Sequence, residues 1–170
     1  MKKSECKNKT QGVTLIMLAI TVVVLLILAG VTIYSGKDML KKAKLEELKT
    51  NMLLIQAKAR GYVEDATFRM GIDSQPSKKE TVREEVYIQE AKLEKANANT
   101  IPSDFKIGDV TTCYWLTAEA QSNWGLNKIK LEQDEKYLIQ FDEKNVTVEI
   151  YNTKGYDGKY KLADIETIQE

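Results

Sequence analysis

The sequence feature that most constrains the fold is a run of 27 residues, Thr10 to Gly36, without a single charged side chain. Fourteen of the 22 residues from Val13 to Tyr34 are Val, Leu or Ile. As a helix, these 22 residues are roughly 33 Å long, enough to cross the hydrocarbon core of a bilayer. A chain of 170 residues has too little protein to surround such a helix. The run therefore predicts a transmembrane helix rather than a buried core helix.

The residues at the two ends of the apolar run distinguish between the kinds of membrane segment that it could be. A cleaved secretory signal has an apolar region of about 7–15 residues followed by a small-residue cleavage site. This run is longer and lacks that site. A lipoprotein signal needs a cysteine after the small residues of Leu28-Ala29-Gly30, where Val31 stands instead. An uncleaved signal-anchor and a precursor that is cut before the apolar run both fit.

The stretch Lys9-Thr10-Gln11-Gly12-Val13-Thr14-Leu15-Ile16 resembles the junction of type IV pilin and pseudopilin precursors. In that family a short basic leader ends in glycine and an apolar segment follows at once. Residues 19–33 resemble the version of this segment found in Gram-positive bacteria. The resemblance implies that a prepilin peptidase cuts between Gly12 and Val13 and methylates the new amine of Val13. It also implies a structural subunit of a type IV pilus or a type II secretion-type filament.

The same resemblance implies an organisation in three parts. Residues 1–12 are a basic cytoplasmic leader, residues 13–35 are a transmembrane and assembly helix, and residues 36–170 are an extracellular domain. The expected partners are membrane lipid, prepilin peptidase and other pilin-like subunits, and the expected localisation is single-pass membrane or surface filament. The alternative is an uncleaved, membrane-anchored extracellular binding module.

One position departs from the family pattern. The fifth residue after the cut is usually Glu, which is thought to neutralise the amine of a neighbouring subunit, but Met17 stands there. Methionine cannot accept that charge, and an unpaired buried ammonium is costly. The sequence therefore favours a tip or minor subunit, or a lineage in which the hydroxyls of Thr14 or Thr21 serve instead.

Composition excludes several function classes. Lys+Arg and Asp+Glu are both 25, so no basic surplus points to nucleic acid. Histidine, the commonest general base and metal ligand, is absent from the sequence. We expect no enzyme activity, no cofactor and no metal. Two cysteines, Cys6 and Cys113, are too few for a disulfide framework, and we interpret Cys113 as a small buried apolar residue.

Beyond the apolar run, a second helical pattern is amphipathic. Its apolar residues recur at spacings of three and four, which places them on one helix face: Leu45, Leu48, Met52, Ile55, Ala59, Tyr62 and Ala66. This stripe either packs against the sheet of its own domain or forms a coiled coil with a second chain. We favour the first interpretation, because the stripe covers barely three heptads.

The rest of the chain predicts an α+β fold, with a long N-terminal helix, a second helix and a small C-terminal antiparallel sheet. Ser77 and Glu80 have the spacing of a capping box, which predicts a helix from there to about Asn97, with Arg83 on its solvated face. Residues 137–141 and 146–151 predict a β-hairpin, and Ile129 to Leu131 predicts a shorter strand before it. The pattern also predicts a short helix from Thr117 to Gly125 and another strand within residues 156–165.

Oxygen-bearing side chains near the predicted hairpin have two interpretations. Asp142, Glu143 and Asn145, or Asp157 beside Gly158, carry oxygens of the kind that calcium prefers. Hairpin turns use the same residue types, and the spacing of an EF-hand is missing. We favour turns over a calcium site.

Overall fold

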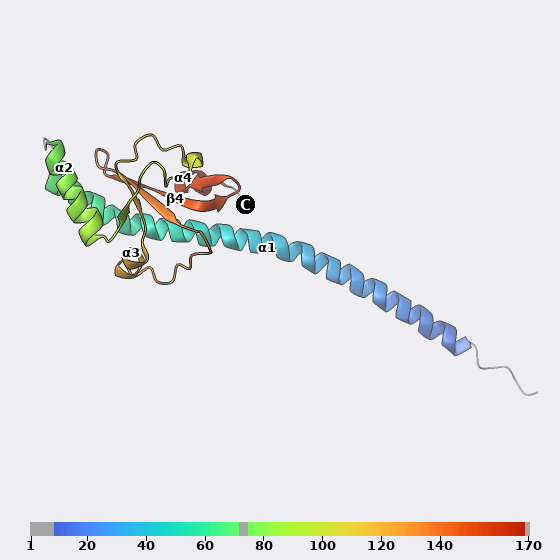
Figure 1. Ribbon diagram of the computed structural model, residues 1–170. Helices are drawn as coiled ribbons and strands as arrows, with labels where there is room; N and C mark the ends of the chain where they lie inside the picture. Colours follow the sequence, from blue (N-terminus) through green and yellow to red (C-terminus); the bar gives the residue numbers. More distant parts are fainter. Residues whose placement is uncertain (1–8, 72–74, 169–170) are drawn as a thin grey trace, which may run out of the picture. The chain divides into compact units, whose positions relative to one another are not determined.

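The computed structural model describes residues 9–71 and 75–168, with the side chains of residues 17–27 and of residue 39 onward in the first helix. The chain divides into two compact units, Met1–Lys44 and Leu45–Glu170. The first helix, α1 (Lys9–Met70), continues through Gly30 and Gly36 and supplies the first element of the second unit (Figure 1).

The prediction of a transmembrane helix is wrong. No helix in the described ranges 9–71 and 75–168 is both long and apolar enough to cross a membrane. The expected fold class with a transmembrane first half and the expected single-pass membrane localisation both depended on that helix and are corrected with it.

The second part of α1 is an amphipathic helix that packs against its own sheet. Met52, Ile55, Ala59 and Ala66 are fully buried, and they share one hydrophobic core with residues of the strands. This packing confirms the predicted stripe and the interpretation that we favoured for it. The stripe missed Val63, which is also fully buried.

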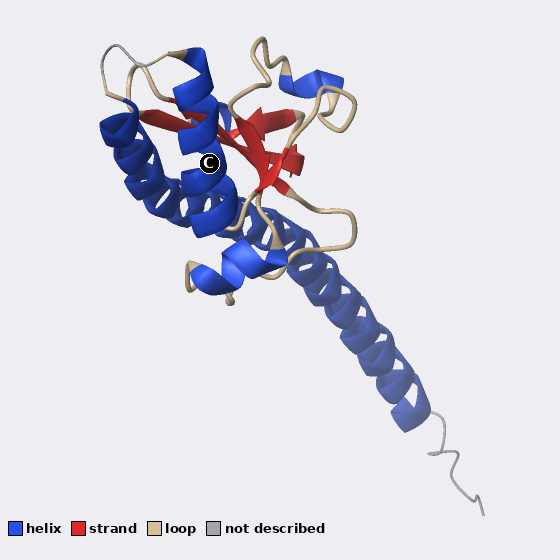
Figure 2. Cartoon of the chain, turned by 60° about the vertical axis from the view of Figure 1, so that its left-hand side comes forward, coloured by secondary structure: helices blue, strands red, loops and turns tan. Residues whose placement is uncertain are grey.

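The remaining elements form one antiparallel sheet with short helices around it (Figure 2). The strands lie in the order β1-β2-β3-β4-β5, so every neighbour in the sheet is also the next strand along the chain. Their bounds are β1 (Glu94–Lys95), β2 (Cys113–Trp115), β3 (Tyr137–Asp142), β4 (Thr147–Tyr156) and β5 (Lys159–Lys161). The helical elements after α1 are α2 (Pro76–Arg83), the π-helix η1 (Glu84–Glu90), the 3₁₀-helix η2 (Ser103–Phe105), α3 (Ala118–Asn123) and α4 (Leu162–Glu166).

Both faces of the sheet are covered. Tyr114, Ile139 and Ile150 belong to the core that includes α1. Their neighbours along the strands, such as Trp115 and Leu138, belong to a second core cluster. Phe105, in the connection between β1 and β2, completes that second cluster and stacks on a tyrosine of β4 with ring centroids 5.1 Å apart. The period of two along a strand thus divides the apolar residues between two layers.

Several predicted boundaries are confirmed and others are wrong. The α+β content, the antiparallel sheet and the hairpin of β3 and β4 are confirmed. Thr117 caps α3 by accepting a bond from the amide of Ala120, as expected for a helix that starts there. The capping box is wrong, because Gln75 precedes α2 and Pro76 occupies its first turn.

The predicted second helix also ends too late, since Ala91 follows its last turn and β1 begins three residues further on. Ile129 is buried in the core, yet the segment from Ile129 to Leu131 is not a strand. Within residues 156–165, β5 is followed at once by α4, so only the first part is a strand.

A backbone feature of β4 gives a stability prediction. Gly155 has φ +58, and a Cβ there would collide with the backbone oxygen of Lys159. Gly158 has φ +71, but a Cβ there would meet no atom within 4 Å. Both alanine substitutions carry the cost of a left-handed conformation, about 1–2 kcal/mol. We expect Gly155→Ala to cost about 1–3 kcal/mol more than Gly158→Ala in urea unfolding, because the strands must also separate. Equal costs would show that β5 does not lie so close to Gly155.

Candidate functional site

The predicted processing and assembly residues lie at the start of α1. Gly12, Val13 and Thr14 fall within its bounds, but their side chains are outside those that the structure describes. Met17 is described, and 68 % of its surface is exposed. It is the first residue of an exposed apolar surface.

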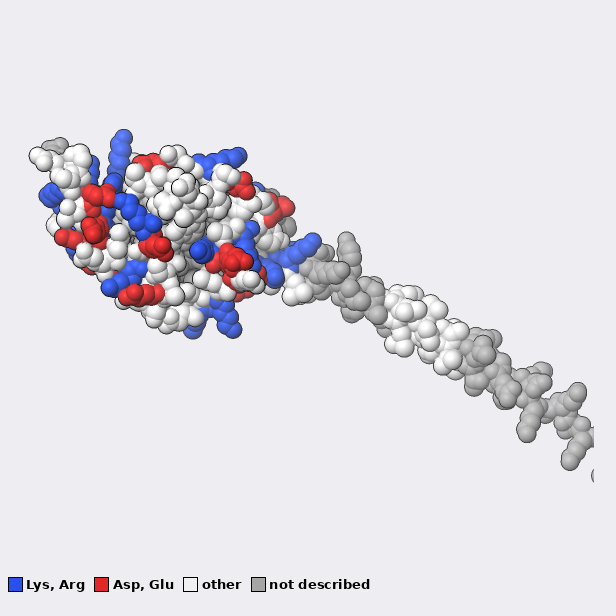
Figure 3. Space-filling model, in the orientation of Figure 1, with Lys and Arg blue, Asp and Glu red and all other residues white. Residues whose placement is uncertain are grey.

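This surface, which we call the apolar band, consists of residues 17–27 on α1. Its large side chains have exposed fractions between 47 % and 68 %, with no charged residue among them. They are Met17, Leu18, Ile20, Val22, Val23, Val24, Leu25, Leu26 and Ile27. The hydroxyl of Thr21 donates to the carbonyl oxygen of Leu18 at 2.8 Å, so its proton is satisfied within the helix. Figure 3 shows the band as white surface, whereas both charge signs intermingle on the visible face of the second unit.

The second candidate is a cavity of about 980 Å³ within the second unit. The end of α1, α2, the segment before β2, the β3–β4 hairpin and β5 contribute to its wall. The charged side chains that line it are the cations Lys79, Arg83, Lys144 and Lys161 and the acids Asp109, Asp142, Glu143 and Glu149.

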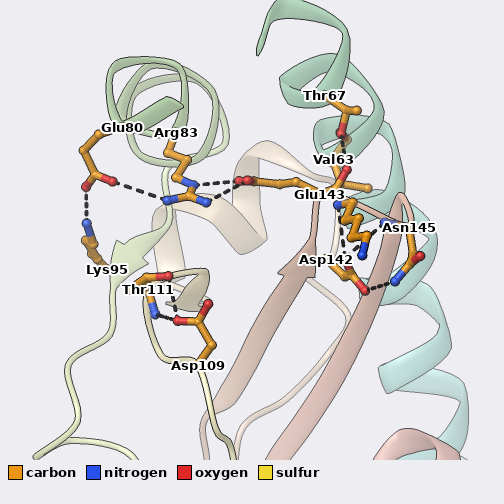
Figure 4. A network of polar contacts seen from close by, with 11 residues as sticks. Val63, Thr67, Glu80, Arg83, Lys95, Asp109, Thr111, Asp142, Glu143 and Asn145 are labelled. Atoms are coloured by element: carbon orange, nitrogen blue, oxygen red, sulfur yellow. Dashed lines mark hydrogen bonds and ion pairs between the residues drawn. The ribbon is translucent and has the colours of Figure 1, made fainter. Parts of the chain in front are cut away.

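An ion pair joins two elements that are far apart in the sequence. The guanidinium of Arg83 on α2 donates two hydrogen bonds, each 2.8 Å, to the carboxylate of Glu143 in the hairpin turn (Figure 4). The side chains are only 18 % and 12 % exposed. The bonds to Glu143 raise the pKa of Arg83 above its ordinary value, although burial acts against the rise. Glu80 extends the pair, because its carboxylate contacts both Arg83 and Lys95.

Two other acids of the cavity are already bonded by their own loops. The carboxylate of Asp109 accepts from the amide and the hydroxyl of Thr111, at 2.9 and 2.7 Å. The carboxylate of Asp142 accepts from the amides of Lys144 and Asn145, each at 3.1 Å, and from the side-chain amide of Asn145. These hydrogen bonds, led by those of the Thr111 and Asn145 side chains, lower the pKa of both carboxyls. Of the oxygens considered for calcium, those of Asp142 thus stabilise the hairpin turn and those of Glu143 accept from Arg83. The described residues contain no cluster of three metal-ligating side chains.

The second unit also buries groups that are ordinarily reactive. Cys113 is fully buried, and burial raises the pKa of its thiol to about 12, so it carries no thiolate at neutral pH. Tyr87 and Tyr114 are buried as well, and their hydroxyls have no hydrogen-bond partner among the residues that the structure describes. Burial raises the pKa of both phenols. Burial thus keeps this thiol and these two phenols in their protonated forms at neutral pH.

Sequence reasoning missed the cavity. We interpreted Arg83 as a solvated charge and Glu143 as a turn residue, but the fold brings them together across 60 positions of the chain. The spacing of residues along the chain does not predict an ion pair between positions so far apart. The sequence did locate the band, because that feature depends only on a continuous apolar run.

No protein-family model, no curated protein and no solved structure matches this chain. The comparisons thus give no support to membership of the pilin family. The resemblance to pilin precursors depends on the residues of the N-terminal segment alone.

The Arg83–Glu143 pair gives the next prediction. Glu143→Gln keeps the shape of the side chain but removes the nearer counter-charge of a mostly buried guanidinium, which keeps only its 3.5 Å contact with the more exposed Glu80. We expect a loss of about 1–3 kcal/mol in the free energy of unfolding, between the values for exposed and fully buried pairs. The control is Glu119→Gln, which removes an exposed pair with Lys92 at 3.7 Å and should cost under about 1 kcal/mol. Equal losses would mean that the pair does not fix α2 to the hairpin.

Proposed function

We propose that this chain is a pilin-like structural subunit that assembles into a type IV pilus-type or secretion-type filament. Prepilin peptidase processes it between Gly12 and Val13. The observation that carries the proposal is the apolar band, in which nine large apolar side chains lie exposed on one helix. Large apolar surfaces of this kind mark sites of association.

The band fits association between helices. Its exposed apolar residues follow one another without interruption, so every side of the helix presents apolar surface. A helix that is apolar on every side is ordinarily buried. Copies of the same helix offer matching surfaces, and packing them side by side removes the band from water. The second unit, by contrast, buries its large apolar residues in two core clusters of its own.

Two features of the sequence add to this support. The glycine that precedes the apolar run has no Cβ, which lets an extended backbone enter a protease cleft. Met17 provides no charge, so any role in neutralising a neighbour's amine falls to hydroxyls or is not needed at a filament tip.

The experiment follows both processing and assembly. In cells with a prepilin peptidase, we expect N-terminal sequencing to find a chain that starts at Val13, and Gly12→Leu to block the cut. The processed chain should sediment as filaments, and Leu25→Asp should abolish this, because each contact would bury an unpaired carboxylate. Leu131→Asp, at a 41 % exposed leucine of the second unit, is the control and should still assemble.

Two outcomes contradict the proposal. One is a chain that retains Met1 in cells with an active peptidase. The other is assembly that tolerates Leu25→Asp as well as it tolerates Leu131→Asp, which would show that the band is not the contact surface.

A further inference from the structure

The cavity of the second unit has two lysines whose ammonium groups form no ion pair with any described residue. Arg83 is paired with Glu143, and Lys161 with Glu149 at 3.4 Å. Asp109 and Asp142 are bonded by their own loops. In the described part of the chain, the ammonium groups of Lys79 and Lys144 have no hydrogen-bond or ion-pair partner.

The two lysines come from different walls of the cavity. Lys79 is half-buried on α2, and Lys144 is exposed at the tip of the β3–β4 hairpin. The Arg83–Glu143 pair joins these two elements and so fixes the walls relative to each other. Two lysines on elements fixed in this way bring unpaired ammonium groups to one cavity, where both can meet the carboxylates of a ligand, while the cavity's own acids are engaged with other groups of the chain.

An apolar side chain completes the site. Phe68 at the end of α1 lines the same cavity and is 87 % exposed, the largest fraction among the large apolar residues of the described chain. Exposed aromatic side chains beside a concave surface serve as anchors for binding. A volume of about 980 Å³ suits a short peptide and far exceeds a single inorganic anion.

We propose that this cavity binds an acidic peptide segment of a partner protein, with carboxylates on Lys79 and Lys144 and an apolar side chain against Phe68. This binding is independent of filament assembly, because the cavity and the apolar band belong to different units of the chain.

Fluorescence anisotropy with a fluorescein-labelled peptide, Glu-Glu-Phe-Leu-Glu-Glu, tests the proposal on the full chain. The double variant Lys79→Glu/Lys144→Glu should weaken binding at least about tenfold, because attraction becomes repulsion. The control Lys78→Glu/Lys130→Glu makes the same change in net charge at exposed lysines outside the cavity and should leave affinity within about twofold. Phe68→Ala should weaken binding of this peptide, but not of a peptide with Ala in place of both Phe and Leu.

Folding and charge are controlled separately. Lys79→Gln/Lys144→Gln removes the charges without adding repulsion and should also weaken binding, while its circular dichroism spectrum remains that of the parent. Inorganic phosphate at matched ionic strength should not compete with the peptide. The proposal is overturned if the peptide does not bind or if the two double Lys→Glu variants weaken its binding equally. It is also overturned if phosphate competes fully, since the site would then recognise charge alone.

Discussion

The packing of one helix face against the sheet is the interaction on which the rest of the second unit depends. Met52, Ile55 and Ala59 leave no surface exposed, and they meet strand residues such as Ile139 and Ile150 in one core. The small side chain of Ala59 lets the helix approach the sheet closely, and the longer side chains of Met52 and Ile55 fill the space beside it. Without this face, β3 and β4 would expose one whole side of the sheet.

The other contacts extend this core outward. Tyr62 stacks on Trp124 with centroids 5.3 Å apart, which ties the α3 region to α1, and Tyr87 stacks on Phe141 at 4.0 Å, which ties η1 to the sheet. Two bidentate ion pairs join the ends of these elements. Arg69–Glu90 links the end of α1 to the end of η1, and Arg83–Glu143 links the end of α2 to the β3–β4 turn. The walls of the cavity between α2 and the hairpin are held in place by these contacts. The stacked rings and the ion pairs fix the elements from which the walls are built.

The sequence could predict those parts of the structure that depend on the pattern of residues close together along the chain. Helical spacing located the stripe from Leu45 to Ala66, and alternation located β3 and β4. β2 was missed because Cys113, Tyr114 and Trp115 are all buried, so the run shows no alternation. The cavity was missed because Arg83 and Glu143 acquire their partners only through the fold. The transmembrane prediction was drawn from hydropathy alone, and no helix among the described residues is long and apolar enough to bear it out.

The seam between helix and sheet is tested most directly by comparing Ile55→Asp with Lys58→Asp in urea unfolding of the full chain. Ile55 is fully buried against the sheet, and Lys58, one turn further along the same helix, is exposed. A carboxylate at position 55 would be buried without a partner, so we expect a loss of about 3–5 kcal/mol, against under about 0.5 kcal/mol at position 58. Equal losses in the two variants would contradict the assignment of this helix face and the fold that is built on it.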